Sequence, residues 1–194
     1  MITNIPDLDI ELLYYLDITS IMNLHTICKG EYILISNLDF IQGLQLIKKK
    51  YKYTTIENII NLASMYGFIS ILEWVKNSIH KFIYNDDAID FAATNNHLSV
   101  LKWFDQSPYE FKYTSYATSA ASRNGNIEIL EWLHKSKYEF KYNSNSIDWA
   151  SLFGHINVLE WFKNSNYKLI YNNALTWAKR NNHQHILSWL EKNL

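Results

Sequence analysis

The side chains of this chain that could most readily do chemistry are its seven histidines and its single cysteine. His97, His155 and His183 occupy equivalent positions of a repeated segment, so they would lie one helix-packing distance of about 8–10 Å apart. A metal ion needs its ligands within a few ångström of one another. Three other histidines have no cysteine or carboxylate at ligand spacing: His25, His134 and His185. We therefore expect no metal site and no cofactor.

Motifs of known catalytic chemistry are absent from the sequence, namely GxSxG, HExxH, the P-loop and GxGxxG. Cys28 shares an apolar stripe with Ile21 and Leu24, which favours a buried, inert thiol over a nucleophile. Three glycines are placed to end helices rather than to bind phosphate: Gly67, Gly125 and Gly154. We expect a protein without enzymatic activity.

The composition excludes further classes of protein. Lysine plus arginine number 18 against 19 aspartate plus glutamate, and 48% of the residues are hydrophobic, which is enough to build a core. The chain lacks the basic excess of a nucleic-acid-binding protein, and only Arg123 and Arg180 are arginines. One cysteine favours a reducing compartment. No long apolar run occurs, and acidic Asp7, Asp9 and Glu11 do not suit a signal peptide, so we expect an intracellular protein without a membrane partner.

A repeat of 29 residues dominates the sequence. Five tryptophans recur at intervals of 29, 29, 29 and 28 residues: Trp74, Trp103, Trp132, Trp161 and Trp189. Trp149 and Trp177 share a second equivalent position. Such self-similarity is typical of stacked supersecondary units. We place the array at residues 51–194, with units at about 55–83, 84–112, 113–141, 142–170 and 171–194.

Each unit is expected to hold two short helices and an extended connector. The first helix of residues 142–170 is expected to begin at a capping Asn145, to end at Gly154 and to bury Ile147, Ala150 and Phe153. The second helix is expected to carry an apolar stripe of Ile156, Leu159 and Phe162, with Val158 and the repeated Trp161 flanking the stripe among core aliphatic residues. Residues 109–113 and 138–142 alternate apolar and charged side chains, which is typical of an extended segment with one packed face.

Pairs of small residues recur in the first helices and would let two helices approach closely: Ala63-Ser64, Ala92-Ala93, Ala121-Ser122 and Ala150-Ser151. Helices shorter than about 12–15 residues are marginal in isolation, so stacking must supply the missing buried surface. We expect one cooperative all-α solenoid, with the indole rings buried in a single row.

Segments 121–130 (ASRNGNIEIL) and 150–159 (ASLFGHINVL) resemble the ankyrin repeat, which runs from small residues in a first helix through glycine and histidine into an aliphatic second helix. The resemblance covers residues 55–194. It implies an ankyrin-like helical solenoid with shortened 29-residue repeats and an N-terminal helical cap. The usual period is about 33 residues. The Thr-Pro-Leu-His tetrapeptide of the family is replaced at residues 87–90 and 145–148.

The tryptophan of the second helix and the aromatic connector resemble the divergent ankyrin proteins of amoeba-infecting giant DNA viruses. Abundant Asn, Ile, Lys and Tyr, all encodable with A and T alone, fit such a genome. This resemblance implies a non-enzymatic scaffold for protein–protein interaction that is directed at host or viral proteins. It also implies a location in the host cytoplasm, or in the nucleus.

Residues 1–50 do not follow the repeat, and residues 5–16 and 20–29 resemble an F-box. That family docks the Skp adaptor of cullin ubiquitin ligases through an apolar surface. The resemblance assigns that surface to Leu8, Leu12, Leu16, Ile21 and Leu24. The basic-Trp element of the family is missing, with Gly30, Glu31 and Tyr32 in its place. The alternative is an amphipathic cap that covers the first repeat.

Partner-binding residues are expected where the units differ, between the connector tyrosine and the first helix. These residues are Asp86, Asp87, Ser115, Tyr116, Ser144 and Asn145. Tyr116 could also be a residue that only starts a helix. Stacking of nucleic-acid bases on the aromatic positions would need interleaved cations. Glu110 and Glu139 alternate with lysines there instead, so we expect no binding of nucleic acid. We expect a monomer that binds a protein partner.

Overall fold

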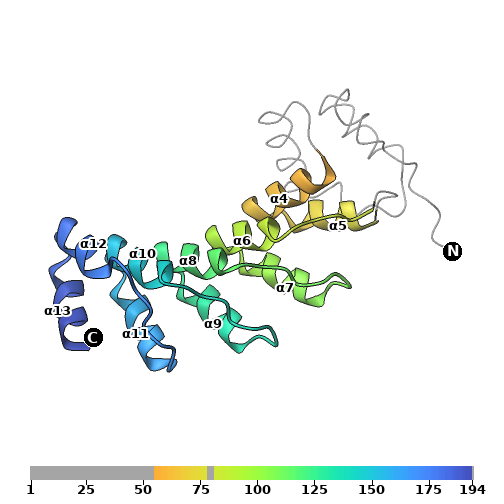
Figure 1. The fold of residues 1–194 in the computed structure, drawn as a ribbon. Helices are drawn as coiled ribbons and strands as arrows, with labels where there is room; N and C mark the ends of the chain where they lie inside the picture. Colours follow the sequence, from red (N-terminus) through yellow and green to blue (C-terminus); the bar gives the residue numbers. More distant parts are fainter. Residues whose placement is uncertain (1–54, 78–80, 194) are drawn as a thin grey trace. The chain divides into compact units, whose positions relative to one another are not determined.

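The computed structural model describes residues 55–77 and 81–193, and every regular element in these ranges is an α-helix (Figure 1). The helices are α4 (Ile56–Tyr66), α5 (Ile69–Asn77), α6 (Asp87–Thr94), α7 (Leu98–Gln106), α8 (Ser115–Arg123), α9 (Ile127–Lys135), α10 (Asn145–Phe153), α11 (Ile156–Asn164), α12 (Ala174–Arg180) and α13 (Gln184–Asn193). The prediction of an all-α chain is confirmed for this part. Cys28 and the five leucine and isoleucine residues assigned to an adaptor surface lie outside the described residues.

The chain divides into two compact units between Asn85 and Asp86. Helices α4 and α5 belong to the first unit, where they pack against each other. The Thr55 hydroxyl caps α4 by accepting a hydrogen bond of 3.2 Å from the backbone N–H of Asn58. Helices α6 to α13 belong to the second unit.

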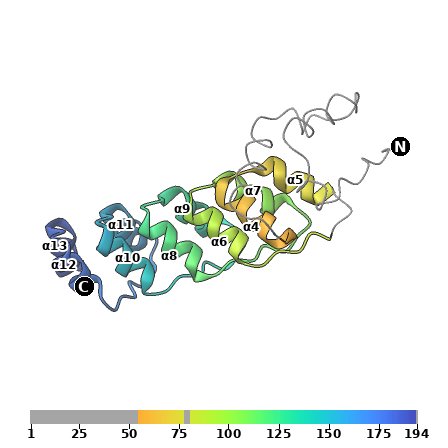
Figure 2. The same cartoon turned by 90° about the horizontal axis from the view of Figure 1, so that it is seen from above.

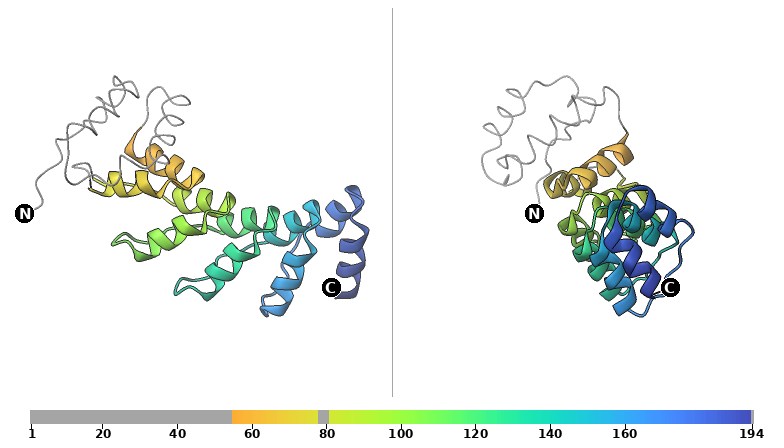
Figure 3. Two further views of the ribbon diagram at one scale, coloured as in Figure 1. Left: turned by 180° about the vertical axis from the view of Figure 1, so that it is seen from behind. Right: turned by 90° about the vertical axis from the view of Figure 1, so that its left-hand side faces the viewer.

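The helices of the second unit form two rows. Helices α6, α8, α10 and α12 pack against one another in chain order, and each also packs against the helix that follows it (Figures 1 and 2). Seen from behind, α6, α8, α10 and α12 form one continuous row from which the following helices extend (Figure 3). The small residues predicted for close approach are fully buried: Ala92, Ala93, Ala121, Ser122, Ala150 and Ser151. Their size lets α8 approach α10 until the Ser119 and Ser146 hydroxyls lie 3.3 Å apart.

Helix α4 of the first unit and helices α6, α8, α10 and α12 of the second unit are each followed by a left-handed residue at an equivalent position of the repeat. The φ angle there is 77° at Gly67, 61° at Asn96, 71° at Gly125, 78° at Gly154 and 58° at Asn182. In each pair the next backbone N–H returns to the helix, as His155 does to Ala150 O at 2.8 Å. The prediction that the three glycines end helices is confirmed. The two asparagines take the same conformation, which the sequence analysis missed.

The equivalent histidines lie at the turn between the two helices of a pair. His97 and His155 directly precede α7 and α11, and His183 directly precedes α13. A Cβ atom at Gly125 would lie 2.8 Å from His155 Nδ1, and one at Gly154 would lie 3.0 Å from the His183 ring. His183 Nε2 also lies 3.0 Å from Leu152 O. Each of these two rings therefore packs on the glycine of the preceding pair.

The prediction of a buried row of tryptophans is wrong. In α11 the fully buried residues are Val158, Leu159 and Phe162, whereas Trp161 is half-buried. The indole N–H of Trp161 donates a hydrogen bond of 2.6 Å to Glu131 Oε2. A buried indole needs an acceptor for its N–H, and this ring finds one at the partly exposed edge of the preceding helix pair. Ile156 is half-buried as well.

Two details predicted for the first helix of residues 142–170 are also wrong. Asn145 is the first residue of α10, and its backbone N–H donates a hydrogen bond of 3.0 Å to Asn143 Oδ1. The side chain that accepts from the start of the helix is therefore that of Asn143, not that of Asn145. Phe153 is 44% exposed. At about 100° per residue, six residues place it about 120° away from buried Ile147 around the helix.

We predict that Gly125→Ala lowers the free energy of unfolding by about 1–3 kcal/mol, because the alanine would need a positive φ and its Cβ would meet the His155 ring. The measurement is urea unfolding of the full chain, followed by circular dichroism. Asn96→Gly is the matched control, because glycine adopts the same φ freely, and a change near zero is expected. Equal stability of Gly125→Ala and the wild type would contradict this account of the turn.

Candidate partner-binding surface

The connectors of the second unit are extended but form no sheet among the described residues. In residues 109–113 the aromatic Phe111 and Tyr113 are buried while Glu110 and Lys112 are exposed, so the predicted alternation is confirmed. The Tyr113 hydroxyl donates to Glu139 O and accepts from the backbone N–H of Lys141 at 3.1 Å. A side chain therefore joins successive connectors where a sheet would use backbone hydrogen bonds.

Aromatic stacking joins the same connectors. The Phe111 ring stacks on Tyr138 with 4.2 Å between centroids, and Phe140 stacks on Tyr167 at 4.6 Å. The ring centroid of half-buried Trp132 lies 5.6 Å from that of Phe111, and the ring centroid of half-buried Trp161 lies 5.6 Å from that of Phe140. The tryptophans thus belong to an aromatic layer between the second helices and the connectors.

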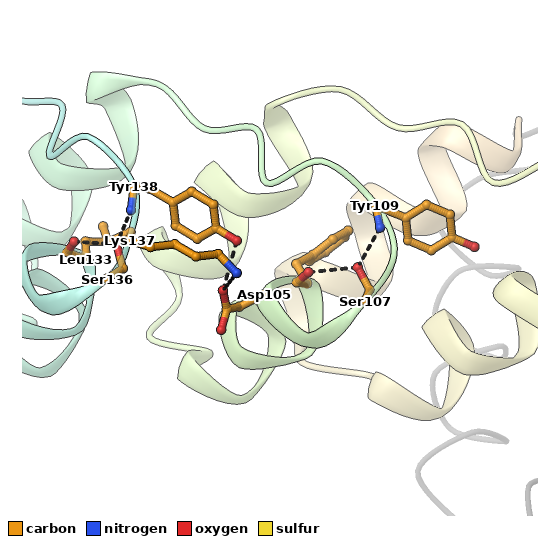
Figure 4. Close-up of polar contacts among 8 residues, drawn as sticks. Asp105, Ser107, Tyr109, Leu133, Ser136, Lys137 and Tyr138 are labelled. Carbon is orange, nitrogen blue, oxygen red and sulfur yellow. Dashed lines mark hydrogen bonds and ion pairs between the residues drawn. The ribbon is translucent and has the colours of Figure 1, made fainter.

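A polar contact fastens the loop after α9 to the end of α7 (Figure 4). Asp105 Oδ1 accepts from Lys137 Nζ at 3.0 Å and from the Tyr138 hydroxyl at 2.9 Å. These two donors hold the pKa of the Asp105 carboxyl below its ordinary value. In the next pair the Tyr167 hydroxyl lies 2.8 Å from His134 Nδ1, so a tyrosine contact recurs there with a different partner.

The turns that lead into these loops are alike (Figure 4). The Ser107 hydroxyl donates to Phe104 O at 2.7 Å and accepts from the Tyr109 N–H at 3.3 Å. Ser136 makes the same two contacts with the equivalent residues, Leu133 and Tyr138. The serines satisfy backbone groups at the helix ends, which fixes the direction of each connector.

Two buried carboxylates bind the start of the following pair. Asp90 accepts from the Thr114 backbone N–H at 3.0 Å and from its hydroxyl at 2.5 Å. Asp148 accepts from the backbone N–H groups of Asn172 and Asn173. Burial raises the pKa of Asp90 to about 6, against the lowering effect of the Thr114 hydrogen bonds. These carboxylates place the segments in which partner-binding residues were predicted.

Four of the six predicted partner-binding residues are exposed. Asp87 begins α6 and directly follows Asp86, and Asn145 begins α10. Tyr116, the second residue of α8, is 43% exposed, and its ring meets Trp149 edge-on with 6.1 Å between centroids. All four lie at the starts of helices in one row, so the structure brings them to a common face.

The other two predicted residues are engaged inside the fold. Ser115 and Ser144 are half-buried, and each hydroxyl oxygen accepts a hydrogen bond of 2.9 Å from an asparagine of the following pair. The donors are Asn143 and Asn172. These serines join neighbouring helix pairs and are less available to a partner than the sequence analysis supposed.

The row of first helices exposes further residues that the sequence analysis did not select. Trp149 and Trp177 are half-buried at equivalent positions of α10 and α12. Phe153 is exposed at the end of α10, and the Arg123 guanidinium lies 5.1 Å from the centre of its ring. The repetition of the tryptophans led to the prediction that they lie in the core. Trp149 and Phe153 are four residues apart, so they lie on the same face of α10, and this face is the outer one.

The described residues contain no group of three or more histidine, cysteine, aspartate and glutamate side chains that could hold a metal ion. Within the same ranges no helix has both the length and the apolar character needed to cross a membrane. Comparison of the sequence with protein-family models gives no match, and comparison with curated proteins gives none either.

We predict that Asp90→Asn raises the free energy of unfolding at pH 7 by about 1–3 kcal/mol. The folded-state pKa of about 6 lies above the ordinary value of 3.8, so the buried charge destabilises the folded state above pH 6. As the pH falls through 6 towards 4 the folded protein takes up the proton first, so the advantage of the variant should shrink by pH 4.5 to about a third of its value at pH 7. Urea unfolding of both proteins at pH 7 and pH 4.5 measures this difference.

Exposed Glu128 provides the control, since Glu128→Gln should change stability little at either pH. A variant at position 90 that is less stable than the wild type at pH 7 would contradict the prediction. It would mean that the two Thr114 hydrogen bonds to the carboxylate outweigh the cost of burying its charge.

Proposed function

We propose that this chain is an ankyrin-like solenoid of shortened 29-residue repeats that serves as a scaffold for protein–protein interaction and has no catalytic activity. The observation that supports the architecture is the packing of α6, α8, α10 and α12 in chain order, each with a second helix beside it. The second helices α5, α7, α9 and α11 begin at Ile69, Leu98, Ile127 and Ile156, which are 29 residues apart. An array of this kind presents one long face to a partner.

The contrast between buried and exposed equivalent positions supports the function. Small buried residues such as Ala92, Ala121 and Ala150 are the same in successive helix pairs. The exposed helix starts differ, with Asp87, Tyr116 and Asn145 at one equivalent position. Residues that vary on a constant framework can determine which partner is bound, and tyrosine is enriched among residues that dominate binding energy. The proposed partners are host or viral proteins in the cytoplasm of an infected amoeba.

We predict that a variant with Asp86→Ala, Tyr116→Ala and Asn145→Ala loses most of the proteins that the intact chain captures from a lysate of infected amoebae. The matched control replaces three exposed residues of second helices, Lys102, Glu128 and Asn157, by alanine. It should capture the wild-type set. Quantitative mass spectrometry of the three eluates measures the result, and an unchanged set with the first variant would contradict the assignment of this surface.

The alternative function, recruitment of a substrate to a cullin ubiquitin ligase, depends on the F-box-like residues 5–29, which lie outside the described residues. It predicts binding of a purified Skp adaptor to the full chain. Glu substitutions at Leu12 and Leu24 should abolish that binding by placing charge in an apolar interface. No binding, or binding that survives both substitutions, would leave these residues as a cap.

A further inference from the structure

The two arginines of the chain occupy equivalent positions on the exposed face of the first helices. Arg123 ends α8 and Arg180 ends α12, and half-buried Leu152 holds the same position in α10 between them. Each guanidinium lies over an aromatic ring, at 5.1 Å from the centre of Phe153 and 5.8 Å from that of Trp177. Within the described ranges neither arginine forms an ion pair.

Six residues of the first helices form a surface that we name the arginine–aromatic face: Tyr116, Arg123, Trp149, Phe153, Trp177 and Arg180. It combines tyrosine, tryptophan and arginine, the residue types that most often dominate binding energy at protein interfaces. Stacking on a ring holds a guanidinium in place and leaves its N–H groups for a carboxylate. The arginine–aromatic face could therefore bind an apolar side chain that has a carboxylate on either side of it.

The charges on these helices are of one sign. The exposed charged residues of α8, α10 and α12 are Arg123, Lys179 and Arg180, all positive. The carboxylate of Asp148 in α10 is buried and accepts from backbone N–H groups. Among the described first helices of the second unit, exposed carboxylates occur at the start of α6, with Asp86 and Asp87. An acidic segment of a partner would be attracted to α8–α12 and repelled from Asp86 and Asp87, so these two residues contribute to binding by fixing the position of the segment along the row.

We propose that the arginine–aromatic face binds an acidic, extended peptide segment of a partner protein, with an apolar side chain against Trp149 and carboxylates on Arg123 and Arg180. This inference rests on the proposed function and specifies the chemistry of the partner. Helices in contact lie about 8–10 Å apart, so the arginines of α8 and α12 are separated by roughly 16–20 Å. An extended chain rises about 3.3 Å per residue, so the two carboxylates should lie about five or six residues apart.

A single strand of nucleic acid is the competing ligand, because it too combines negative charge with flat rings. Three cations over three helices give little of the continuous basic groove that such strands require. The neighbouring carboxylates of Asp86 and Asp87 would repel a long polyanion that followed the row. The observations therefore favour a peptide with few, spaced charges.

The test is a selection of random dodecapeptides, displayed on phage, against the immobilised full-length chain. The enriched peptides are then synthesised with a fluorescent label and titrated by anisotropy. We expect them to carry two carboxylates five or six residues apart with an apolar residue between. Binding should weaken about tenfold in the double variant Arg123→Gln, Arg180→Gln, and about threefold when both are changed to lysine, which keeps the charge but loses the planar stacking.

The matched control is Lys102→Gln with Lys163→Gln, which removes two exposed positive charges from second helices and should weaken binding less than twofold. Circular dichroism melting curves establish that every variant is folded. No enrichment, enrichment of neutral or basic peptides, or equal binding by the arginine variant would overturn the inference. Arginine-dependent binding of a labelled 20-nucleotide oligo-dT would overturn it as well.

Failure of this inference can be distinguished from failure of the proposed function. If the arginine variant still captures the wild-type set of proteins from the amoeba lysate, the scaffold function stands and the arginine–aromatic face is not its binding site. If the wild-type chain captures no protein above an empty matrix, the proposed function itself fails.

Discussion

Close packing of the first helices is the constraint on which the rest of the second unit depends. Buried alanine and serine residues leave α8 and α10 near enough for the hydroxyls of Ser119 and Ser146 to meet at 3.3 Å. The contacts that join successive pairs need the same spacing. Asp90 reaches the backbone of Thr114, and the Tyr113 hydroxyl reaches the next connector. A bulky side chain at one of these small-residue positions would move the helix pairs apart and break all of these hydrogen bonds.

The same packing explains how structure and function are divided among the residues. Inner faces of the first helices pack against neighbouring helices. Asp148 in α10 and Ser144 directly before it accept hydrogen bonds from the following pair. Exposed outer positions are not required for this packing, so substitutions there are expected to change stability little. Tyr116, Trp149 and Arg123 occupy outer positions. A partner would meet a rigid surface whose chemistry is set by exposed side chains alone.

The sequence predicted the framework better than the surface. Close helix packing at pairs such as Ala121-Ser122 follows from small residues that recur at one position of the repeat, and the left-handed Gly154 follows from a glycine at a helix end. Both predictions were confirmed. Asn96 was missed because asparagine tolerates positive φ but does not require it. Burial of Phe162 was predicted correctly, but Trp161 was also assigned to the core, because periodicity locates a helical face only to within one position. The engagement of Ser144 by Asn172 could not be predicted, because it depends on the spacing between helix pairs.

Native-state hydrogen exchange at increasing urea concentrations tests the central claim most directly, because it measures whether helix pairs open together. If α8 and α10 depend on each other's buried surface, their slowest amides should converge on one free energy of opening and one urea dependence. Separate values, with the amides of α10 exchanging through an opening that leaves α8 protected, would show that each pair is stable by itself. That result would contradict the mutual dependence of the stacked pairs.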